Sequence, residues 1–263
     1  MKQKILVKGP VLSQSGYGEQ ARFALRALRS RTDIFDVYVL PTSWGRTGWV
    51  SLDNEERGWI DERIAAAHHH NQHGGKYDIS LQITIPNEWE KLAPINVGYT
   101  AGIETTRVAP VWLQKANEMD KIIVVSNHSK EVFKTTTYTA DHPQTGQLVN
   151  LLCHTDIDVV NYPVKEHGVE KLDLKLTHDF NYLAISQWGP RKNFDNLINW
   201  FIEENFDQEV GLVLKTSISN NSIIDREHTE NRLRNIVSRH GDMKCKVYLV
   251  HGDMSEAQMA GLY

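Results

Sequence analysis

The chain has 263 residues, of which 40% are hydrophobic and 24% charged, and its formal net charge is −4. This length suits one large domain or two ordinary ones, and the small negative charge gives no global argument for nucleic acid or an anionic membrane. Cys153 and Cys245 lie far apart and predict neither a disulfide framework nor zinc, which favours a reducing, cytoplasmic setting. We expect no membrane span, because no run of about 18 apolar residues occurs, and no signal peptide is evident.

The first part of the chain alternates predicted strands with predicted helices. Such alternation indicates a parallel sheet covered on both faces. We expect an N-terminal Rossmann-like domain over residues 1–165, followed by a linker over 166–179 that is charged and lacks a strong period. Strands are predicted over 3–8, 35–40, 77–85, 95–100, 121–126 and 159–164, helices over 21–28, 54–70, 111–118 and 127–134, and a loop or hairpin over 135–150.

The same alternation then restarts. Residues 180–263 are expected to form a partial second Rossmann-like domain, whose last helix begins at residue 255 and runs to the end of the chain. We expect its last strand to expose an edge and apolar surface. Strands are predicted over 180–186, 210–215 and 246–251, and helices over 194–201, 227–240 and 255–263.

A glycine loop separates the first predicted strand from its helix. The stretch SGYGEQARFALRAL contains Gly16 and Gly18, followed by apolar residues at helical spacing. Backbone N–H groups at such a helix start bind anions, and glycine lets a ligand approach the backbone closely. The loop is neither a dinucleotide fingerprint nor a Walker loop, because the third glycine and a Gly-Lys-Ser/Thr sequence are missing. A tight turn without a ligand explains the glycines equally simply.

Three basic residues follow strands of the second predicted domain. Arg191 and Lys192 lie in the loop QWGPRKN, where a strand leads into a helix, and Lys215 ends the next strand. Because parallel strands open onto one edge of a sheet, these cations are expected to face one crevice. Such a trio suits a diphosphate, whereas the alternative is that they are ordinary surface charges.

The ordered set of motifs resembles the group 1 (family 4) glycosyltransferases, which have the two-Rossmann-domain GT-B architecture. Six stretches carry the resemblance, in family order and through nearly the whole chain. They are SGYGEQARFALRAL, NVGYTAGIETTRVAPVW, MDKIIVVSNHSKEVF, ISQWGPRKNFDNLINWF, GLVLKTSISN and KVYLVHGDMSEAQMAGLY.

The resemblance implies a nucleotide-sugar site. The lysine of the family's arginine–lysine pair matches Lys192, its arginine position falls near Ser186 or Gln187, and Arg191 is the substitute. Lys215 matches a basic residue at the next strand end. The resemblance also implies that Gly16 and Gly18 face the cleft, where donor phosphate or acceptor comes close.

The resemblance further implies that a hexose moves from a nucleoside-diphosphate sugar to an acceptor hydroxyl, with retention and without a metal or cofactor. The acceptor remains open between a glycan, a lipid-linked sugar and a modified base in DNA. The family's Glu-x7-Glu motif follows a segment like the last one here, so we expect a complementary chain or self-association. Two other readings stay open: a non-catalytic nucleotide-sugar-binding half of a split enzyme, and a nucleotide-sugar epimerase.

Other residues are weaker candidates. Glu104 follows a strand at the same sheet edge, where a carboxylate would orient the acceptor hydroxyl or act as a base, and a solvated acid is the alternative. A tryptophan-rich segment suggests an acceptor wall, although core packing is the commoner explanation. We expect no metal site from the histidines, and an N-cap at Ser126 or Asn127. Thr100, Thr105 and Arg107 are candidates to assist Glu104, and the tryptophans of the segment are Trp44, Trp49 and Trp59. The residues considered as metal ligands are His68, His69, His70 and His73, and His154, Asp156 and Asp158.

Overall fold

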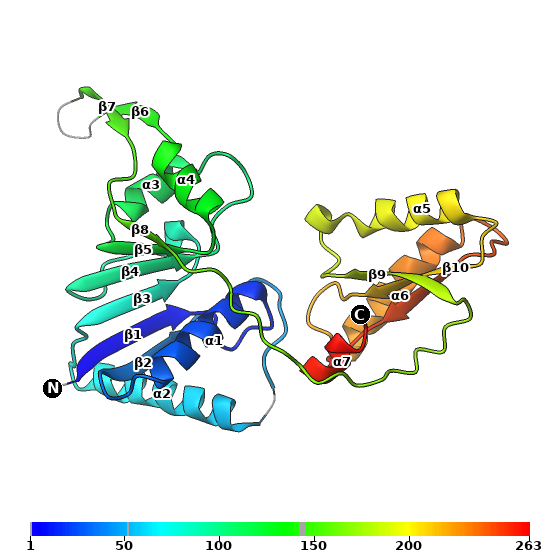
Figure 1. Cartoon of the computed structure of the whole chain (residues 1–263), viewed down its shortest axis with the longest axis horizontal. Helices are drawn as coiled ribbons and strands as arrows, with labels where there is room; N and C mark the ends of the chain where they lie inside the picture. The colour runs from blue at the N-terminus through cyan, green and yellow to red at the C-terminus, as the bar shows by residue number, and fades with distance from the viewer. Residues whose placement is uncertain (1, 52, 142–145) are drawn as a thin grey trace. The chain divides into compact units, whose positions relative to one another are not determined.

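The computed structural model describes residues 2–51, 53–141 and 146–263. The chain divides into two compact units, the first made of Met1–Gly45 and Trp49–Pro163 and the second of Arg46–Gly48 and Val164–Tyr263. Each unit is built on a parallel β-sheet joined by helices (Figure 1). The expected α/β fold, a Rossmann-like parallel-sheet unit followed by a smaller one, is therefore confirmed. No helix among the described residues is long and apolar enough to cross a membrane.

The first unit has a six-stranded sheet with the order β2-β1-β3-β4-β5-β8, in which every neighbouring pair is parallel. The chain leaves β1 toward β2 and later returns to the other side of β1. Loops diverge at such a reversal, so ligands of open parallel sheets bind at the carboxyl ends of the strands nearby. The strands are β1 (Gln3–Gly9), β2 (Phe35–Pro41), β3 (Ile79–Ile83), β4 (Ile95–Thr100), β5 (Lys121–Val124) and β8 (Ile157–Val159).

Helices cover both faces of this sheet. Helix α1 (Gly16–Arg29) packs on one face, and α2 (Glu55–Gln72) lies beside it along the edge strand β2; Leu25 and Ile60 of these helices join the first apolar cluster. Helices α3 (Pro110–Ala116) and α4 (Asn127–Thr135) pack on the other, where Leu113 and Phe133 join a second cluster. The predicted helical spacing of α1 is confirmed, since its apolar positions lie against the sheet: Ala21, Ala24, Leu25 and Leu28.

The connection between β3 and β4 covers part of the second face without an α-helix. It contains one short 3-10 turn, η1 (Pro86–Glu88). The buried Gln82 amide accepts from Glu90 N at 3.0 Å and donates to the Glu90 carbonyl. The buried Asn96 Oδ1 accepts from Leu92 N and Ala93 N, at 2.8 and 3.1 Å. Two side-chain amides thus satisfy loop backbone groups that a helix would have paired internally.

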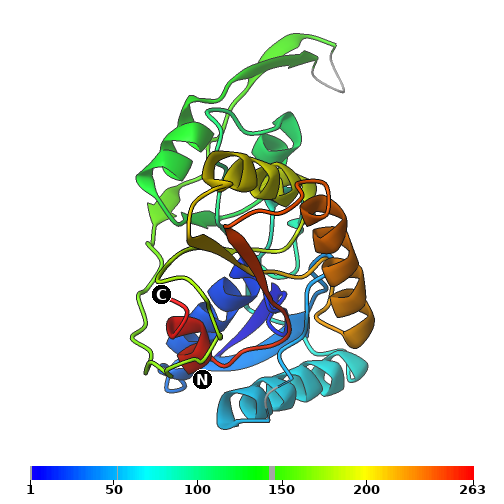
Figure 2. The same ribbon diagram turned by 90° about the vertical axis from the view of Figure 1, so that its right-hand side faces the viewer.

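In this unit the predicted loop or hairpin is confirmed as a hairpin, and one predicted strand needs adjustment. Residues 135–150 include an antiparallel hairpin of β6 (Tyr138–Asp141) and β7 (Leu148–Leu151), which projects from the unit in both views (Figure 1, Figure 2), while 142–145 lie outside the described residues. The strand predicted over 159–164 was wrong in extent. It is β8 and ends at Val159, because Pro163 and a polar neighbour, Asn161, interrupt the apolar run.

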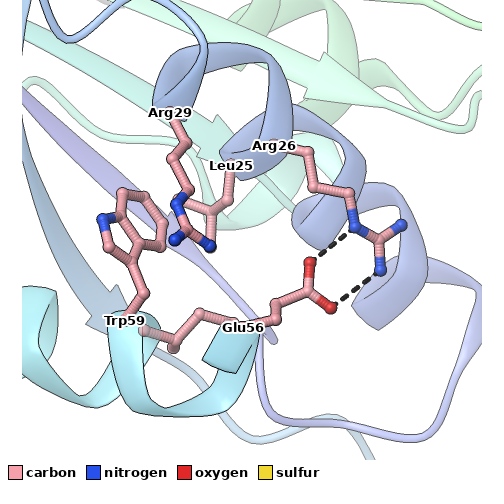
Figure 3. Close-up of a pocket in the computed structure, with 6 residues that line it drawn as sticks. Leu25, Arg26, Arg29, Glu56 and Trp59 are labelled. Atoms are coloured by element: carbon pink, nitrogen blue, oxygen red, sulfur yellow. Dashed lines mark hydrogen bonds and ion pairs between the residues drawn. The ribbon is translucent and has the colours of Figure 1, made fainter. Parts of the chain in front are cut away.

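An ion-pair network joins α1 to α2 (Figure 3). Arg26 pairs with Glu56 through two bonds of 2.5 and 2.9 Å and also reaches Glu19 at 2.8 Å. Beside it, the Arg29 guanidinium lies 5.4 Å from the ring of Trp59. The cavity between these side chains measures about 10 Å³, about the space of one water molecule. These side chains therefore form a contact between the two helices, and the space between them is too small for a ligand.

The second unit has a three-stranded parallel sheet with the order β11-β10-β9. One apolar cluster holds Leu212 and Leu214 of β10 together with residues of α5 and α6. A short helix, α7, begins with a capping box at Ser255 and ends at Ala260, before the end of the chain, contrary to expectation. The elements are β9 (Phe180–Ile185), η2 (Pro190–Lys192), α5 (Phe194–Asn205), β10 (Val210–Lys215), α6 (Ile223–Val237), β11 (Lys246–Val250) and α7 (Glu256–Ala260).

The last strand, β11, lies at an edge of this sheet as predicted, but the large exposed apolar side chains lie at the other edge, on β9. Phe180 and Tyr182 of β9 are 57% and 49% exposed, and Trp200 of α5 is 60% exposed. The Phe180 and Tyr182 rings meet edge to face at 5.0 Å. Residues 247–250 of β11 are only partly exposed, because the segment before β9 reaches that strand, where Thr177 N donates to Tyr248 OH at 3.0 Å.

The turn between β1 and α1 is closed by contacts among its own residues and those of α1. Ser15 caps the helix by accepting from Gly18 N at 3.0 Å, so both glycines lie in the first helical turn and not in the preceding loop. A Cβ on Gly18 would overlap the Ser13 carbonyl oxygen, whereas a Cβ on Gly16 would meet nothing within 4 Å. Arg22 fastens the same turn by donating to the Ser13 carbonyl at 2.9 Å.

These surroundings predict opposite outcomes for two alanine substitutions. Gly18→Ala should lower the free energy of unfolding by about 1–3 kcal/mol, because the new methyl group displaces backbone. The matched control Gly16→Ala should leave stability unchanged or raise it by up to about 1 kcal/mol. Urea denaturation of both variants measures the difference, and equal effects would contradict the packing role assigned to Gly18.

Candidate functional site

The first unit contains a cavity of about 560 Å³ at the carboxyl ends of β4 and β5. Its volume falls within the roughly 300–1,000 Å³ that small-molecule sites occupy. The loop after β4, the loop after β5, the start of α1 and the segment after β8 all contribute to it. The lining residues are Tyr17, Ala101, Gly102, Ile103, Glu104, Val125, Ser126, His128, Ser129 and Tyr162.

Tyr17 ties the start of α1 to the end of β4. Its hydroxyl lies 2.8 Å from Thr100 Oγ1 and accepts from Ala101 N at 3.2 Å. Burial raises the pKa of this phenol above its usual value of 10. The Trp44 ring lies against Tyr17 with 4.3 Å between centroids. The result is a rigid aromatic wall with its polar end fixed at the strand terminus.

Tyr162 forms a second wall of the cavity. Its hydroxyl donates to Gln20 Oε1 at 3.3 Å, and burial, with the phenols of Tyr17 and Tyr99 nearby, raises the pKa of Tyr162 to about 12. Gln20 is 1% exposed, and its Nε2 has no partner among the described residues. Tyr162 therefore stays a neutral hydrogen-bonding group at physiological pH.

The N-terminus of α4 closes the third side. Ser126 caps this helix by accepting from Ser129 N at 3.1 Å, which confirms the predicted N-cap. Gly102 has φ +84°, and a Cβ there would overlap the Ser129 hydroxyl, so the loop after β4 needs glycine at this point. Glu104 lines the cavity, as does His128, which bonds to the Thr105 carbonyl at 3.2 Å.

The other sequence candidates of this unit are spread over it. Arg107 points to the hairpin, where it donates to the Thr137 carbonyl and lies 4.6 Å from the Tyr138 ring. Trp59 packs against the core and Trp49 is exposed, so Trp44 is the tryptophan that contacts a cavity residue. Among the described residues no three His, Cys, Asp or Glu side chains converge as metal ligands. That statement covers His68, His69, His70, His73, His154, Asp156 and Asp158.

In the second unit, the loop after β9 is anchored at both ends. Gln187 donates to the Ile218 carbonyl at 3.1 Å, and the buried Trp188 ring donates to Asp195 at 3.1 Å. Arg191 and Lys192 lie in η2 directly before α5, and both are exposed. Among the described residues the Lys192 ammonium has no hydrogen-bond or ion-pair partner. Asn193 adopts a left-handed φ of 52° and gives α5 no side-chain cap.

Lys215 ends β10 and is buried at 9% exposure. Its ammonium donates to the Gly252 carbonyl at 2.5 Å, which joins the ends of β10 and β11. Burial lowers the pKa of this ammonium, and the charge of Asp253 opposes that shift. The three predicted cations thus follow neighbouring strands, but Lys215 uses its charge on the protein's own backbone.

Sequence reasoning missed a buried pair beside Lys215. His251 Nε2 donates to Asp225 Oδ2 at 2.9 Å, and the two side chains are 3% and 4% exposed. Asp225 Oδ1 also accepts from Ser219 N at 2.8 Å, so one carboxylate holds both the loop after β10 and the end of β11. A sequence signal existed, because Asp225 lies three residues after the N-cap Ser222, where a carboxylate favours a helix start. The distant His251 partner gave no such signal.

Comparison with known proteins finds a similarity of three-dimensional structure to a solved protein. No family model matches the chain, and no curated protein matches it. A solved structure of a mutant O-GlcNAc transferase from Thermobaculum terrenum aligns with a TM-score of 0.45 and 11% identity. The alignment covers 97% of this chain, which spans 45% of the length of the transferase chain. A likeness at this level carries no argument about function.

The raised pKa of Tyr162 predicts how stability changes in alkaline solution. The unfolded chain loses this proton near pH 10 and the folded chain near pH 12, so the folded state binds more protons between these values. The stabilisation is complete below pH 10 and is lost as the pH rises to 12. Urea denaturation at pH 9 to 12 should show a smaller loss for Tyr162→Phe, and parallel losses would contradict the shift.

The buried pair predicts a large cost for removing Asp225. Asp225→Ala should lower the free energy of unfolding by about 3 kcal/mol, because it strands His251 and the Ser219 N–H without a partner. Asp207→Ala is the control, since Asp207 is an exposed carboxylate of the same unit. Urea denaturation compares the two variants, and equal stability would contradict the anchoring role.

Proposed function

We propose that the chain binds a nucleoside-diphosphate sugar through its second unit and transfers the sugar to an acceptor hydroxyl held by its first unit. The resemblance of six ordered motifs to glycosyltransferases supports this proposal. Two parallel-sheet units in succession support it as well, because each offers strand ends and helix starts at one sheet edge.

The observation that carries the proposal is the loop Gln187–Asn193. It is held rigidly by Trp188, and it leaves the Lys192 ammonium, among the described residues, without a partner directly before a helix start. A cation directly before a helix start that lacks a side-chain cap is suited to a diphosphate. Negative charge develops on the departing nucleotide during transfer, so such a cation lowers the barrier.

The cavity of the first unit is suited to the acceptor. Its hydroxyl groups and aromatic rings match a polyhydroxylated ligand, since sugars combine polar edges with apolar faces. Glu104 is the carboxylate in its lining. In this proposal Glu104 orients the acceptor hydroxyl or accepts its proton as the new bond forms.

Calorimetric titration with UDP, GDP and ADP tests the donor site. One nucleotide should bind the wild-type chain, and Lys192→Ala should weaken that binding at least tenfold, about 1.4 kcal/mol. The matched control is Lys246→Ala, because Lys246 is also exposed but begins β11 at the opposite sheet edge. Binding should survive this change.

The outcomes separate the open readings. No binding of any nucleotide, or equal losses in both variants, would reject the proposed donor site. Binding without release of nucleotide from the matching nucleotide sugar, with or without acceptors, would favour a non-catalytic binding module. Turnover of the nucleotide sugar without an acceptor, to give an isomeric sugar, would favour an epimerase.

A further inference from the structure

We propose that the cavity of the first unit selects an uncharged sugar hydroxyl, as in a neutral glycan, over any acceptor that carries phosphate beside that hydroxyl. The description of the ligand as an acceptor rests on the proposed function, but the argument for its selection concerns the cavity alone. It therefore disfavours lipid-linked sugar phosphates and nucleic acid as acceptors.

The first step is the charge of the cavity wall. Of its ten lining residues, Glu104 alone has a carboxylate, and none is lysine or arginine. The polar lining otherwise consists of hydroxyl groups and one imidazole. The phenols of Tyr17 and Tyr162 stay neutral, because burial raises the pKa of each. A phosphate would meet a like charge and no cation on the wall, and sites for phosphate normally supply cations.

The second step concerns basic residues on the elements that build the cavity. Arg22 of α1 is buried and donates to the carbonyls of Val11 and Ser13, and it pairs with Glu19 at 2.8 Å. Arg107, in the loop after β4, is committed to the hairpin. These guanidinium groups serve the protein's own carbonyls and rings, so neither is available to a ligand in the cavity without giving up its contacts. The other basic residues of α1 and α4 do not line the cavity: Arg26, Arg29, Lys130 and Lys134.

The third step is the helix N-terminus, which by itself would favour an anion. Helix α4 begins at the cavity, but the Ser126 hydroxyl already accepts from Ser129 N and lies 3.0 Å from the Ser129 hydroxyl. Glu104 lines the same cavity and opposes the partial positive charge of the helix start. The remaining donors and acceptors match sugar hydroxyl groups, which both donate and accept.

Saturation-transfer NMR on the full chain tests this selection with matched probes. The probes are the methyl glycosides of glucose, galactose, mannose and N-acetylglucosamine, and the 6-phosphates of the same methyl glycosides. At least one neutral glycoside should bind, and its 6-phosphate should bind at least tenfold more weakly. Glu104→Gln should narrow this difference, because the variant removes the like charge from the wall.

A conservative variant locates the binding. Tyr162→Phe removes one hydroxyl from the cavity and should weaken the neutral glycoside about threefold or more. Tyr38→Phe is the matched control, because Tyr38 lies on β2 of the same unit and does not line the cavity. Its affinity should equal that of the wild type.

Three results would overturn the inference: a sugar phosphate that binds as tightly as its neutral partner, no binding of any neutral glycoside, or equal losses in the two tyrosine variants. Failure of the proposed function gives a different pattern. A chain that binds neutral glycosides but no nucleoside diphosphate retains this cavity assignment and loses the transferase proposal. A chain that binds a nucleotide but prefers sugar phosphates loses only the cavity assignment.

Discussion

The Tyr17 hydroxyl is the contact on which the shape of the first cavity depends. It joins the first turn of α1 to the last residue of β4 across an intervening strand, β3, because the sheet order places β3 between β1 and β4. This reach requires the helix to start close to the strand ends. Gly18 permits that approach by letting the helix backbone touch the Ser13 carbonyl. The glycine pattern and the tyrosine between the glycines therefore form one structural device.

The same strand-end geometry is treated differently in the second unit. There the buried Lys215 and the Asp225–His251 pair bind the loop after β10 and the end of β11 into one block. Charges used in this way fix backbone positions and leave little for a ligand. The cations one loop away, Arg191 and Lys192, are exposed. At this sheet edge the buried charges therefore anchor the backbone, and the exposed charges face solvent.

Sequence patterns predicted the elements well and the side-chain partners poorly. Apolar periodicity gave the order of strands and helices, but several ends differ by two or more residues, among them those of β3, β5, β8, α5, α6 and α7. Periodicity reports which face of an element is buried, so it is blind to a hydroxyl that crosses the sheet, such as that of Tyr17. Gly18 illustrates the limit, since a glycine beside a helix start predicts close approach without saying what approaches. In this protein the group that approaches Gly18 is the Ser13 carbonyl of the preceding loop.

The connection between β3 and β4 has a consequence for experiments that read structure from amide protection. The N–H groups of Glu90, Leu92 and Ala93 donate to the side chains of Gln82 and Asn96, which are 0% and 3% exposed. Amides held this way exchange slowly with solvent, because they are released only when the surrounding core opens. Hydrogen-exchange measurements would therefore find these amide protons as well protected as those of a helix, although two side chains provide the protection.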